Sequence, residues 1–329
     1  MAATIQLNTQ ASQTKVQGKS RFPQPVYLNR LVAPRGTDSS SKSEASRPVA
    51  TTKDSTQQSV RSPNLHLGMF EIGKPLGKGK FGRVYLAKHR PSGFICALKV
   101  LDKNEIKREK AETHVRREIE VHSQIRHPGI LGFYNWFHDS RRIFLILEYS
   151  PGGELYKPLR RETRFSERRA AKYAAQVAHA LIYLHSKSIM HRDIKPENIL
   201  IGLHGELKLA DFGYSVHAPS NFRQTLCGTL DYLPPEMLAS GPVKYTKAVD
   251  QWTLGVLTYE FLTGEAPFED TYPMTHKRIL KCDITPLPAW LSPEAKNFVH
   301  SLLVLDPTKR LPLVDVLKHP WIVKNCAQS

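Results

Sequence analysis

The chain has 329 residues, enough for one large domain or two together with a tail. It carries 47 Lys and Arg against 30 Asp and Glu, a net charge of +17 that favours polyanionic partners or substrates with a basic context. The sequence has no signal peptide, membrane span or metal-ligand cysteine spacing, so we expect a soluble cytoplasmic or nuclear protein with free thiols (Cys96, Cys227, Cys282 and Cys326).

The first segment, residues 1–66, is rich in Ser, Thr, Gln and Pro, and has nine Lys and Arg against three Asp and Glu. It cannot bury enough apolar surface to offset its chain entropy, so we expect a disordered tail. Its charge of +6 fits a docking arm for nucleic acid, microtubules or a protein partner, and it fits a merely solvated tail equally well.

A glycine-rich stretch follows a predicted strand that begins at Phe70. On its own, Gly77-Lys-Gly-Lys-Phe-Gly82 is a weak signal, because the same spacing occurs in dinucleotide-binding folds. Here a strand resumes at Val84 where those folds begin a helix, so we predict a hairpin flap whose backbone N–H groups close over phosphates. Leu76 and Val84 would then sandwich an adenine ring.

The next predicted strand, residues 95–100, carries one lysine, Lys99. A lone lysine on a strand usually lies on an exposed face, unless a carboxylate meets it. The helix predicted over residues 111–125 supplies this carboxylate. By helical spacing, Glu118 lies on the same inward face of the helix as Val115, Ile119 and His122. We expect Glu118 to pair with Lys99, which would grip the α- and β-phosphates; the alternative is an exposed glutamate.

A continuous apolar strand, residues 143–147, runs into Glu148-Tyr-Ser-Pro-Gly-Gly153. This transition is typical of a hinge between two lobes, with the carbonyl of Glu148 and the N–H of Ser150 reading the adenine edge. It predicts a small lobe over residues 67–149, a large lobe over 150–323 and a short tail over 324–329.

The stretch His191-Arg-Asp-Ile-Lys-Pro-Glu-Asn198, followed by Asp211-Phe-Gly, has the arrangement needed to transfer a phosphoryl group. Asp193 would accept the proton of a substrate hydroxyl, and Asn198 and Asp211 would hold magnesium ions between the β- and γ-phosphates. The alternative is a chance His-Arg-Asp, which the roughly eleven motif positions found in order make improbable.

Other residues are expected to hold this loop in place. Two short predicted strands, residues 198–201 and 207–210, place the acidic groups on turns. His191 is expected to order the loop and not to bind a metal. Asp250, at the start of a predicted helix, is expected to accept backbone hydrogen bonds from it.

The large lobe is expected to be mainly helical, with a core helix over residues 170–185 and Ser166 as its N-cap. Glu236, in Pro-Pro-Glu, needs a buried cation, and Arg310 is the candidate. Arg192 has no expected partner of its own unless a negative group arrives. A phosphate on Thr225 would provide one and would order the loop; the alternative is an ordinary loop threonine.

These stretches resemble protein kinases, and most closely the aurora family of mitotic serine/threonine kinases, over residues 67–323. The resemblance implies an α+β bilobal fold with a small antiparallel sheet lobe, one key helix and a larger, mainly helical lobe. It rests on these stretches: Phe70 to Gly82, Phe137-His-Asp, Gly205 to Gly213, Ser215-Val-His-Ala-Pro-Ser, and Thr225-Leu-Cys-Gly-Thr-Leu-Asp-Tyr-Leu-Pro-Pro-Glu-Met237.

By this resemblance, Asp193 is the proton acceptor and Lys195 steadies the phosphoryl group in transfer. The implied cofactors are ATP and magnesium, with the metal on Asn198 and Asp211. Thr225 is the implied autophosphorylation site, and its phosphate would be clamped by Arg117, Arg192 and Arg223. The implied nucleotide contacts are Leu76, Gly77, Gly79, Lys80, Gly82, Val84, Ala97, Lys99, Glu118, Leu147, Glu148, Ser150, Glu197, Asn198 and Asp211.

The chain departs from the family at three positions. Tyr214 stands where these kinases usually have Trp, and Phe222 and Gln224 flank Arg223 where the family is usually more basic. These departures bear on the efficiency of autophosphorylation and not on catalysis.

Asn135 and the stretch 153–157 resemble the B/C-type auroras, which join inner-centromere-protein complexes; the A type usually has Gly at the first position and binds a spindle-targeting activator. The resemblance implies an inner-centromere-type activator on the small lobe, and microtubule or chromatin contact through the tail. It also implies a role in chromosome segregation, kinetochore–microtubule attachment and cytokinesis, at the nucleus, centromere, kinetochore and spindle and in the cytoplasm, without a membrane.

Glu154 and Glu197 resemble the carboxylates with which basophilic kinases bind basic residues upstream of the acceptor. The chain's own loop reads Arg223-Gln-Thr225-Leu, so we expect acceptors of the form Arg/Lys-x-Ser/Thr-hydrophobic, and recognition of this loop in trans. The competing hypotheses are a catalytically dead scaffold, an A-type aurora and another basophilic kinase. The first is disfavoured because every catalytic position is filled (Lys99, Glu118, Asp193, Asn198 and Asp211).

Overall fold

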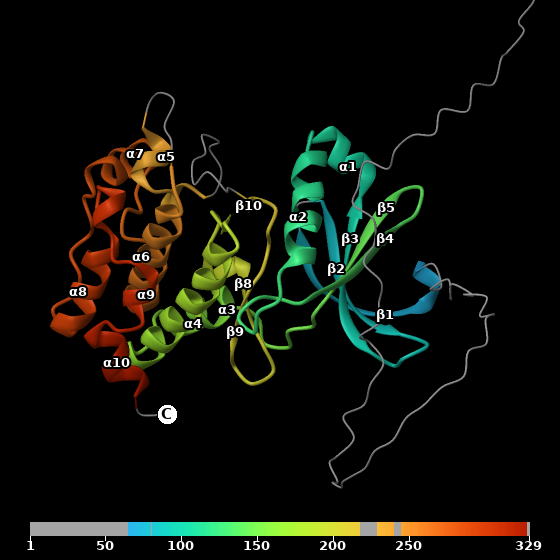
Figure 1. The fold of residues 1–329 in the computed structure, drawn as a ribbon, viewed down its shortest axis with the longest axis horizontal. Helices are drawn as coiled ribbons and strands as arrows, with labels where there is room; N and C mark the ends of the chain where they lie inside the picture. The colour runs from blue at the N-terminus through green and yellow to red at the C-terminus, as the bar shows by residue number, and fades with distance from the viewer. Residues whose placement is uncertain (1–64, 80, 218–228, 240–244, 328–329) are drawn as a thin grey trace, which may run out of the picture.

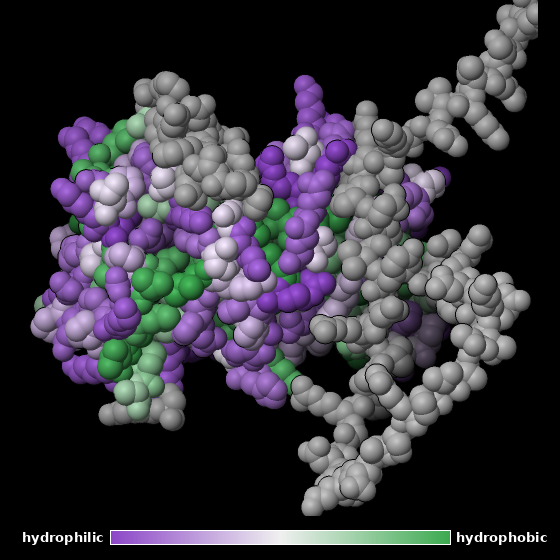
Figure 2. All heavy atoms as spheres, in the orientation of Figure 1, coloured by the Kyte–Doolittle hydropathy of each residue, from purple (hydrophilic) through white to green (hydrophobic). Residues whose placement is uncertain are grey.

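The computed structural model describes residues 65–79, 81–217, 229–239 and 245–327. The chain forms two lobes of unequal size joined side by side, a sheet-based lobe and a helical lobe (Figure 1). Figure 2 shows hydrophilic residues over most of the visible surface of the helical lobe, interrupted by hydrophobic patches. In the described ranges, no helix has both the length and the apolar character needed to cross a membrane.

The small lobe is built on one antiparallel sheet with strand order β1-β2-β3-β5-β4. Its helix α2 (Glu112–Gln124) packs on the sheet, as the helical spacing predicted, and buries Val115, Glu118, Ile119 and His122. The strands are β1 (Phe70–Gly79), β2 (Gly82–His89), β3 (Ile95–Asp102), β4 (Phe133–His138) and β5 (Arg142–Leu147), preceded by the 3₁₀ turn Leu67–Met69.

A short helix that the sequence analysis did not anticipate, α1 (Lys103–Arg108), follows β3 directly. Asp102 begins it, because its carboxylate accepts hydrogen bonds from the N–H groups of Asn104 and Glu105, at 2.8 and 3.1 Å. Charged residues surround its one buried residue, Ile106, which leaves no apolar periodicity to detect.

The large lobe is mainly helical. Small strands line its side facing the sheet: β6 (Gly153–Glu154), β8 (Ile199–Ile201) and β9 (Leu207–Leu209) form one sheet, and β7 (Ile189–Met190) pairs with β10 (Val216–His217). The helices are α3 (Tyr156–Glu162), α4 (Glu167–Ser186), α5 (Pro235–Leu238), α6 (Ala248–Thr263), α7 (Tyr272–Lys281), α8 (Pro293–Leu302), α9 (Leu313–Val316) and α10 (Pro320–Cys326), with 3₁₀ turns at Pro196–Asn198, Leu230–Tyr232 and Pro307–Lys309.

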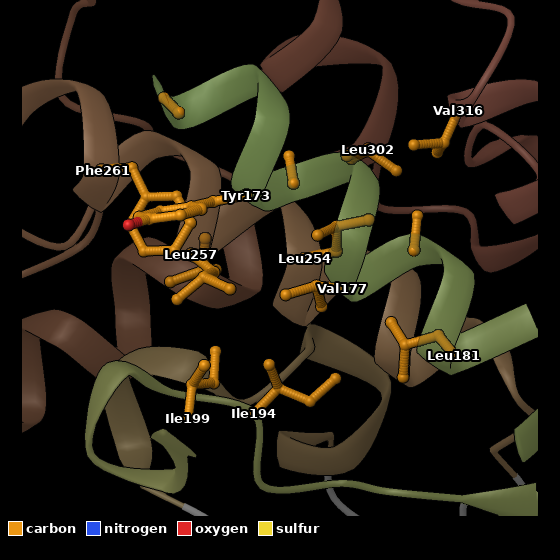
Figure 3. Close-up of a cluster of buried hydrophobic side chains, with 14 of the residues drawn as sticks. Tyr173, Val177, Leu181, Ile194, Ile199, Leu254, Leu257, Phe261, Leu302 and Val316 are labelled. Carbon is orange, nitrogen blue, oxygen red and sulfur yellow. The ribbon is translucent and has the colours of Figure 1, made fainter. Parts of the chain in front are cut away.

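The predicted core helix is α4, and Ser166 caps it by accepting a hydrogen bond from the N–H of Arg169. Helix α6 is buried on all sides and packs against α4 and α8 in the core (Figure 3). At Gly255 of α6, a Cβ would lie 2.9 Å from the side chain of Leu302, so glycine allows the close approach of α8.

The start of α4 is joined to α8 and α10 through one carboxylate. Glu167 accepts hydrogen bonds from the N–H and hydroxyl of Ser292, at 2.9 and 2.6 Å, and from Nε1 of Trp321, at 2.9 Å. Glu236 and Arg310 form the predicted buried pair, with two bonds of 2.7 and 2.6 Å in the fork geometry of a guanidinium and a carboxylate. These contacts fix the helical base that carries the functional loops.

Candidate active site

The glycine-rich stretch forms the end of the β1–β2 hairpin, as predicted, with Gly79 paired to Gly82. A Cβ on Gly82 would lie 1.8 Å from the carbonyl oxygen of Val100, so glycine is required where β2 passes β3. Lys80, a predicted nucleotide contact on this hairpin, lies outside the described residues.

Four of the predicted nucleotide contacts belong to one apolar cluster of the small lobe: Leu76, Val84, Ala97 and Leu147. Ala97 of β3 and Leu147 of β5 are directly paired across the ladder. Ala210, the residue before Asp211, joins the same cluster from the large lobe. An apolar surface suited to a flat ring therefore adjoins the acidic residues.

Lys99 and Glu118 form the predicted ion pair, with Nζ and Oε1 2.6 Å apart. Burial opposes the charge on Lys99, but the carboxylates of Glu118 and Asp211 raise its pKa above the ordinary value, so the ammonium stays charged. Burial also favours the neutral form of Asp211, yet the Lys99 charge and the N–H of Gly213 hold the pKa of Asp211 below its ordinary value. A cation and an ionised carboxylate thus face each other where a triphosphate and its metal would bind.

Asp193 is buried beside two partners from its own loop. Its Oδ2 accepts a hydrogen bond from Nδ2 of Asn198 at 2.7 Å and lies 3.3 Å from Nζ of Lys195. Lys195 also donates to the hydroxyl of Thr229 at 2.6 Å. The other oxygen, Oδ1, is buried without a hydrogen-bond partner among the described residues. A buried carboxylate oxygen with an open lone pair is suited to receive a hydroxyl proton.

The residues present fit a magnesium ion. Magnesium prefers hard oxygen ligands, and Asp211 offers an ionised carboxylate. The amide nitrogen of Asn198 is bonded to both the carbonyl and the carboxylate of Asp193, which leaves its amide oxygen available to bind a metal. The N–H of Ala210 donates to the carbonyl of Asn198 at 2.8 Å, and this bond joins the two turns that carry the ligands.

Asp250 accepts hydrogen bonds from the backbone of the catalytic loop, as predicted. This fully buried carboxylate accepts the N–H of His191 at 3.0 Å and that of Arg192 at 2.9 Å, together with Nε2 of His185 at 2.8 Å. His191 orders the loop in turn, since its ring bonds the carbonyl of Ala210 at 3.2 Å and its burial lowers its pKa, so the ring is neutral.

Two residues of the site adopt the left-handed backbone conformation that side chains usually avoid, Arg192 at φ 70° and Asp211 at φ 61°. The hydrogen bonds to Asp250 and Gly213 compensate for this strain.

The expectation that Arg192 lacks a partner is wrong. Its Nε donates to the carbonyl oxygen of Tyr214 at 2.7 Å, and its other nitrogens bond the same carbonyl and the hydroxyl of Tyr245. These partners lie 22 and 53 residues away along the chain, and one is a backbone group, so residue types could not reveal them. Arg192 is buried and already bonded to the segment that follows Asp211.

Sequence reasoning also missed how Phe212 joins the two lobes. Its ring lies between His122 of α2, with centroids 4.5 Å apart, and His191 of the catalytic loop, at 5.1 Å. His122 is neutral because burial lowers its pKa to about 4, and its Nε2 lies 2.6 Å from the carbonyl of Leu131. The signal in the sequence was His122 itself, a polar residue on the inward face of a helix.

The hinge contains a contact that was not predicted. Oε1 of Glu148 lies 2.9 Å from Nζ of Lys208 on β9, and Oε2 accepts the N–H of Gly132 at 2.9 Å. The N–H of Glu148 donates to the carbonyl of Gly132 at 2.8 Å. Ser150, predicted to read the adenine edge through its N–H, is buried.

A cluster of carboxylates lies beside the catalytic loop, and only Glu197 of this cluster was predicted. Glu260 of α6 interacts electrostatically with Glu197, Glu269 and Asp231, and burial together with these charges raises the pKa of Glu260 to about 8. Its signal in the sequence was a carboxylate flanked by apolar residues, in a helix that carries one other carboxylate, Asp250. Glu154, also predicted for substrate recognition, lies beside Gly77 of the glycine hairpin. Its Oε1 is 3.8 Å from the position that a Cβ on Gly77 would occupy.

The predicted regulatory residues are only partly described. Thr225 and Arg223 lie outside the described residues, and Arg117 lies half-buried on α2. Tyr214, where the resembling family usually has Trp, packs edge-on against His114 of α2, with ring centroids 5.7 Å apart.

Comparison with known proteins identifies the family of the chain. Residues 70–322 match the protein kinase domain family. The chain is 59% identical to an aurora kinase of Schizosaccharomyces pombe over 262 residues, which cover 79% of this chain and 73% of the relative. It is 57% identical to aurora kinase A-B of Xenopus laevis (79% of this chain, 63% of the relative) and 53% identical to aurora kinase B of Danio rerio (79% and 81%).

Protein kinases use ATP and typically magnesium, which agrees with the charged groups around Lys99, Asn198 and Asp211. On both the motif positions and these identities, the chain belongs to the aurora family of protein kinases and is a serine/threonine protein kinase.

Proposed function

We propose that this kinase transfers the γ-phosphoryl group of ATP to Ser or Thr hydroxyls in a basic sequence context. The observation that carries the proposal is Oδ1 of Asp193, which is buried and has no hydrogen-bond partner among the described residues. The ion pair of Lys99 and Glu118 and the ionised Asp211 belong to the same site. Asp193 orients the acceptor hydroxyl and takes its proton as the oxygen attacks phosphorus.

Each neighbour has a separate task in this scheme. Lys99 holds the α- and β-phosphates, and its position is set by Glu118. Asn198 and Asp211 would hold a magnesium ion, which would neutralise charge on the phosphates. Lys195 lies 3.3 Å from Oδ2 of Asp193, where it steadies negative charge on the phosphoryl group in transfer. The backbone of Glu148 and Ser150 reads the adenine edge.

The preference for basic substrates rests on the carboxylates beside the catalytic loop. Glu197 and Glu260 interact closely enough to raise the pKa of Glu260, and an arginine upstream of the acceptor would relieve their repulsion. Glu154 lies beside the glycine hairpin and adds a further carboxylate. We propose acceptors of the form Arg/Lys-x-Ser/Thr-hydrophobic, which includes the chain's own Thr225.

We further propose that phosphorylation of Thr225 activates the enzyme, with Arg117, Arg192 and Arg223 around the phosphate. Arg192 is already bonded to Tyr214 and Tyr245, so the phosphate would act on an arginine held in place and would not recruit a free one. Activation would then stabilise an existing link between the catalytic loop and the segment after Asp211.

For the biological role we propose mitotic chromosome segregation, kinetochore–microtubule attachment and cytokinesis, at the nucleus, centromere, kinetochore and spindle, with cytoplasmic protein as well. An inner-centromere-type activator would bind the small lobe, and the basic tail would contact microtubules or chromatin. The B/C assignment stays a prediction, because A-type and B-type relatives match at 57% and 53% identity. That assignment was based in part on Asn135. This residue is buried in β4, next to a register shift in the pairing with β5, and its side chain accepts a hydrogen bond from the N–H of Trp136.

A peptide library supplied with labelled ATP and magnesium tests the substrate proposal. We expect label on Ser and Thr that follow Arg or Lys by two positions and precede an apolar residue. A preference for acidic or proline-directed sites would contradict the proposal. The Thr225→Ala variant should label the same peptides more slowly, and equal rates would contradict the activating role.

A further inference from the structure

A concave site lies on the large lobe, between the first half of α4 and the turn that joins β8 to β9. It is a hollow of about 320 Å³ whose lining includes three cations, Arg168, Arg169 and Lys172. Ser166 at the N-cap of α4 and Gly205 in the turn complete its rim. It shares no residue with the nucleotide and catalytic site described above.

One of the cations is held in a fixed position. The guanidinium of Arg169 lies 4.1 Å from the ring centre of Phe165 and 5.2 Å from that of Tyr173. It donates to the hydroxyl of Tyr173 at 3.1 Å and to Glu162 at 2.7 Å. An arginine stacked and bonded in this way loses little side-chain freedom when a ligand arrives.

The surroundings keep the hollow positive. Residues 160–172 hold six Arg and Lys against two carboxylates, Glu162 and Glu167. Glu167 is bonded away from the hollow, to Ser292 and Trp321. Glu162 is shared between Arg161, at 3.0 Å, and Arg169. The 20-residue helix α4 also begins here, and its N-terminus adds partial positive charge.

The size and chemistry of the hollow select a class of ligand. Ligand pockets run from about 300 to 1,000 Å³, so this one takes a single side chain or a comparably small group. A hollow lined by arginine, lysine and serine side chains suits a phosphoryl group, which brings about two negative charges and three acceptor oxygens. A nucleic-acid backbone would instead require cations spread along a groove at the phosphate spacing.

We propose that this hollow binds a phosphorylated serine or threonine side chain of another protein. The kinase would thereby dock on a segment that has already been phosphorylated, at a surface separate from its catalytic site. The proposal does not depend on phosphoryl transfer by this chain, because it concerns binding alone.

Gly205 provides the sharpest test. Its φ is 82°, a conformation that Asn and Asp tolerate better than other residues, and a Cβ there would meet nothing within 4 Å. Gly205→Asp and Gly205→Asn therefore differ only in one negative charge at the rim. The probe is a short fluorescent peptide of neutral residues with one phosphoserine and no other Ser, Thr, Arg or Lys, measured by fluorescence anisotropy on the full chain without nucleotide.

We expect the phosphopeptide to bind at least about tenfold more tightly than its unphosphorylated form, and Gly205→Asp to weaken binding by about tenfold while Gly205→Asn has little effect. Lys172→Gln should weaken it as well, whereas Lys318→Gln, which removes the same charge from an exposed lysine that does not line the hollow and is paired with Asp315, should not. Transfer of phosphate to a basic peptide should be unchanged in all four variants, which separates failure of this site from failure of the proposed enzyme.

Four outcomes would overturn the proposal. Equal effects of Gly205→Asp and Gly205→Asn would mean that charge in the hollow does not matter. Equal effects of Lys172→Gln and Lys318→Gln would indicate general attraction to a basic protein. Competition by duplex DNA as strong as that by phosphopeptide, or binding of inorganic phosphate with no gain from the peptide, would assign the surface to another ligand.

Discussion

Nζ of Lys208 on β9 lies 2.9 Å from Oε1 of Glu148, the first residue after β5, and so joins the large lobe to the hinge. The other carboxylate oxygen of Glu148 is bonded to the N–H of Gly132, just before β4. The chain around Gly132 is itself attached to β9, because the N–H of Leu131 donates to the carbonyl of Leu209 at 2.9 Å. The backbone proposed to read adenine is therefore fixed by contacts from two segments, β9 and the residues before β4, which are bonded to each other.

We predict that Lys208→Met raises the KM for ATP several-fold with a smaller change in kcat. The hinge loses the ion pair between Lys208 and Glu148, while the catalytic groups stay in place. The free energy of unfolding should fall by about 1–3 kcal/mol, since Glu148 loses a charged partner. Steady-state kinetics and urea unfolding measure the two effects. The exposed Lys88→Met on β2 is the matched control, and an unchanged KM for ATP in Lys208→Met would refute the positioning role.

A second prediction concerns Asp250. Asp250→Asn should lower the free energy of unfolding by about 3–5 kcal/mol at pH 7, because the N–H groups of His191 and Arg192 and the ring of His185 lose a buried charged acceptor. Asp315→Asn removes an exposed carboxylate paired with Lys318 and should cost less than about 1 kcal/mol. Urea unfolding of both variants compares them.

The same residue predicts a pH dependence. Burial opposes ionisation of Asp250, but His185 and the loop N–H groups hold its pKa below the ordinary value in the folded chain. A carboxyl group whose pKa is lowered by folding stabilises the protein above its unfolded pKa, about 3.9, and loses that contribution as the pH falls below it. The stability gap between the natural chain and Asp250→Asn should be constant from pH 7 to 5 and narrow below about 4. A gap that widens in acid would contradict this sign.

A third prediction follows from Glu260, whose pKa is raised to about 8 by burial and by Glu197 and Glu269. An arginine of the substrate favours the ionised form, so affinity for a basic peptide should rise as the pH increases from 7 to 9. In Glu260→Gln this dependence should be lost and the KM for the peptide should be higher above pH 8, while the KM for ATP stays constant. Kinetics over this pH range measure it, and an equally steep rise in the variant would exclude Glu260 as the titrating group.

Much of the site could be predicted because its residues obey local rules. Helical spacing placed Glu118 inward, and a buried carboxylate needs a cation, which pointed to Lys99. The same argument paired Glu236 with Arg310 and assigned Asp250 to the catalytic loop. In each case a charged residue lay in an apolar pattern, and the cost of burying it unpaired identified a partner.

The remaining contacts depend on how the chain runs in space. Arg192 bonds the carbonyl of Tyr214, and a backbone acceptor carries no trace in the residue types. Lys208 lies on a strand of three residues, too short for its alternation to indicate that it is buried. Glu260 occupies a helix buried on all sides, so helical periodicity could not show that it faces Glu197.

The central claim is that Asp193 accepts the proton of a Ser or Thr hydroxyl at a site assembled by Lys99, Asn198 and Asp211. Asp193→Asn keeps the volume and the bond to Asn198 but removes the acceptor charge. With activated, partner-bound protein and a labelled basic peptide, we predict that kcat falls by at least about a hundredfold, in line with the loss of a general base. ATP affinity and the unfolding midpoint should stay close to those of the natural chain. Transfer by Asp193→Asn at the rate of the natural chain would contradict the account.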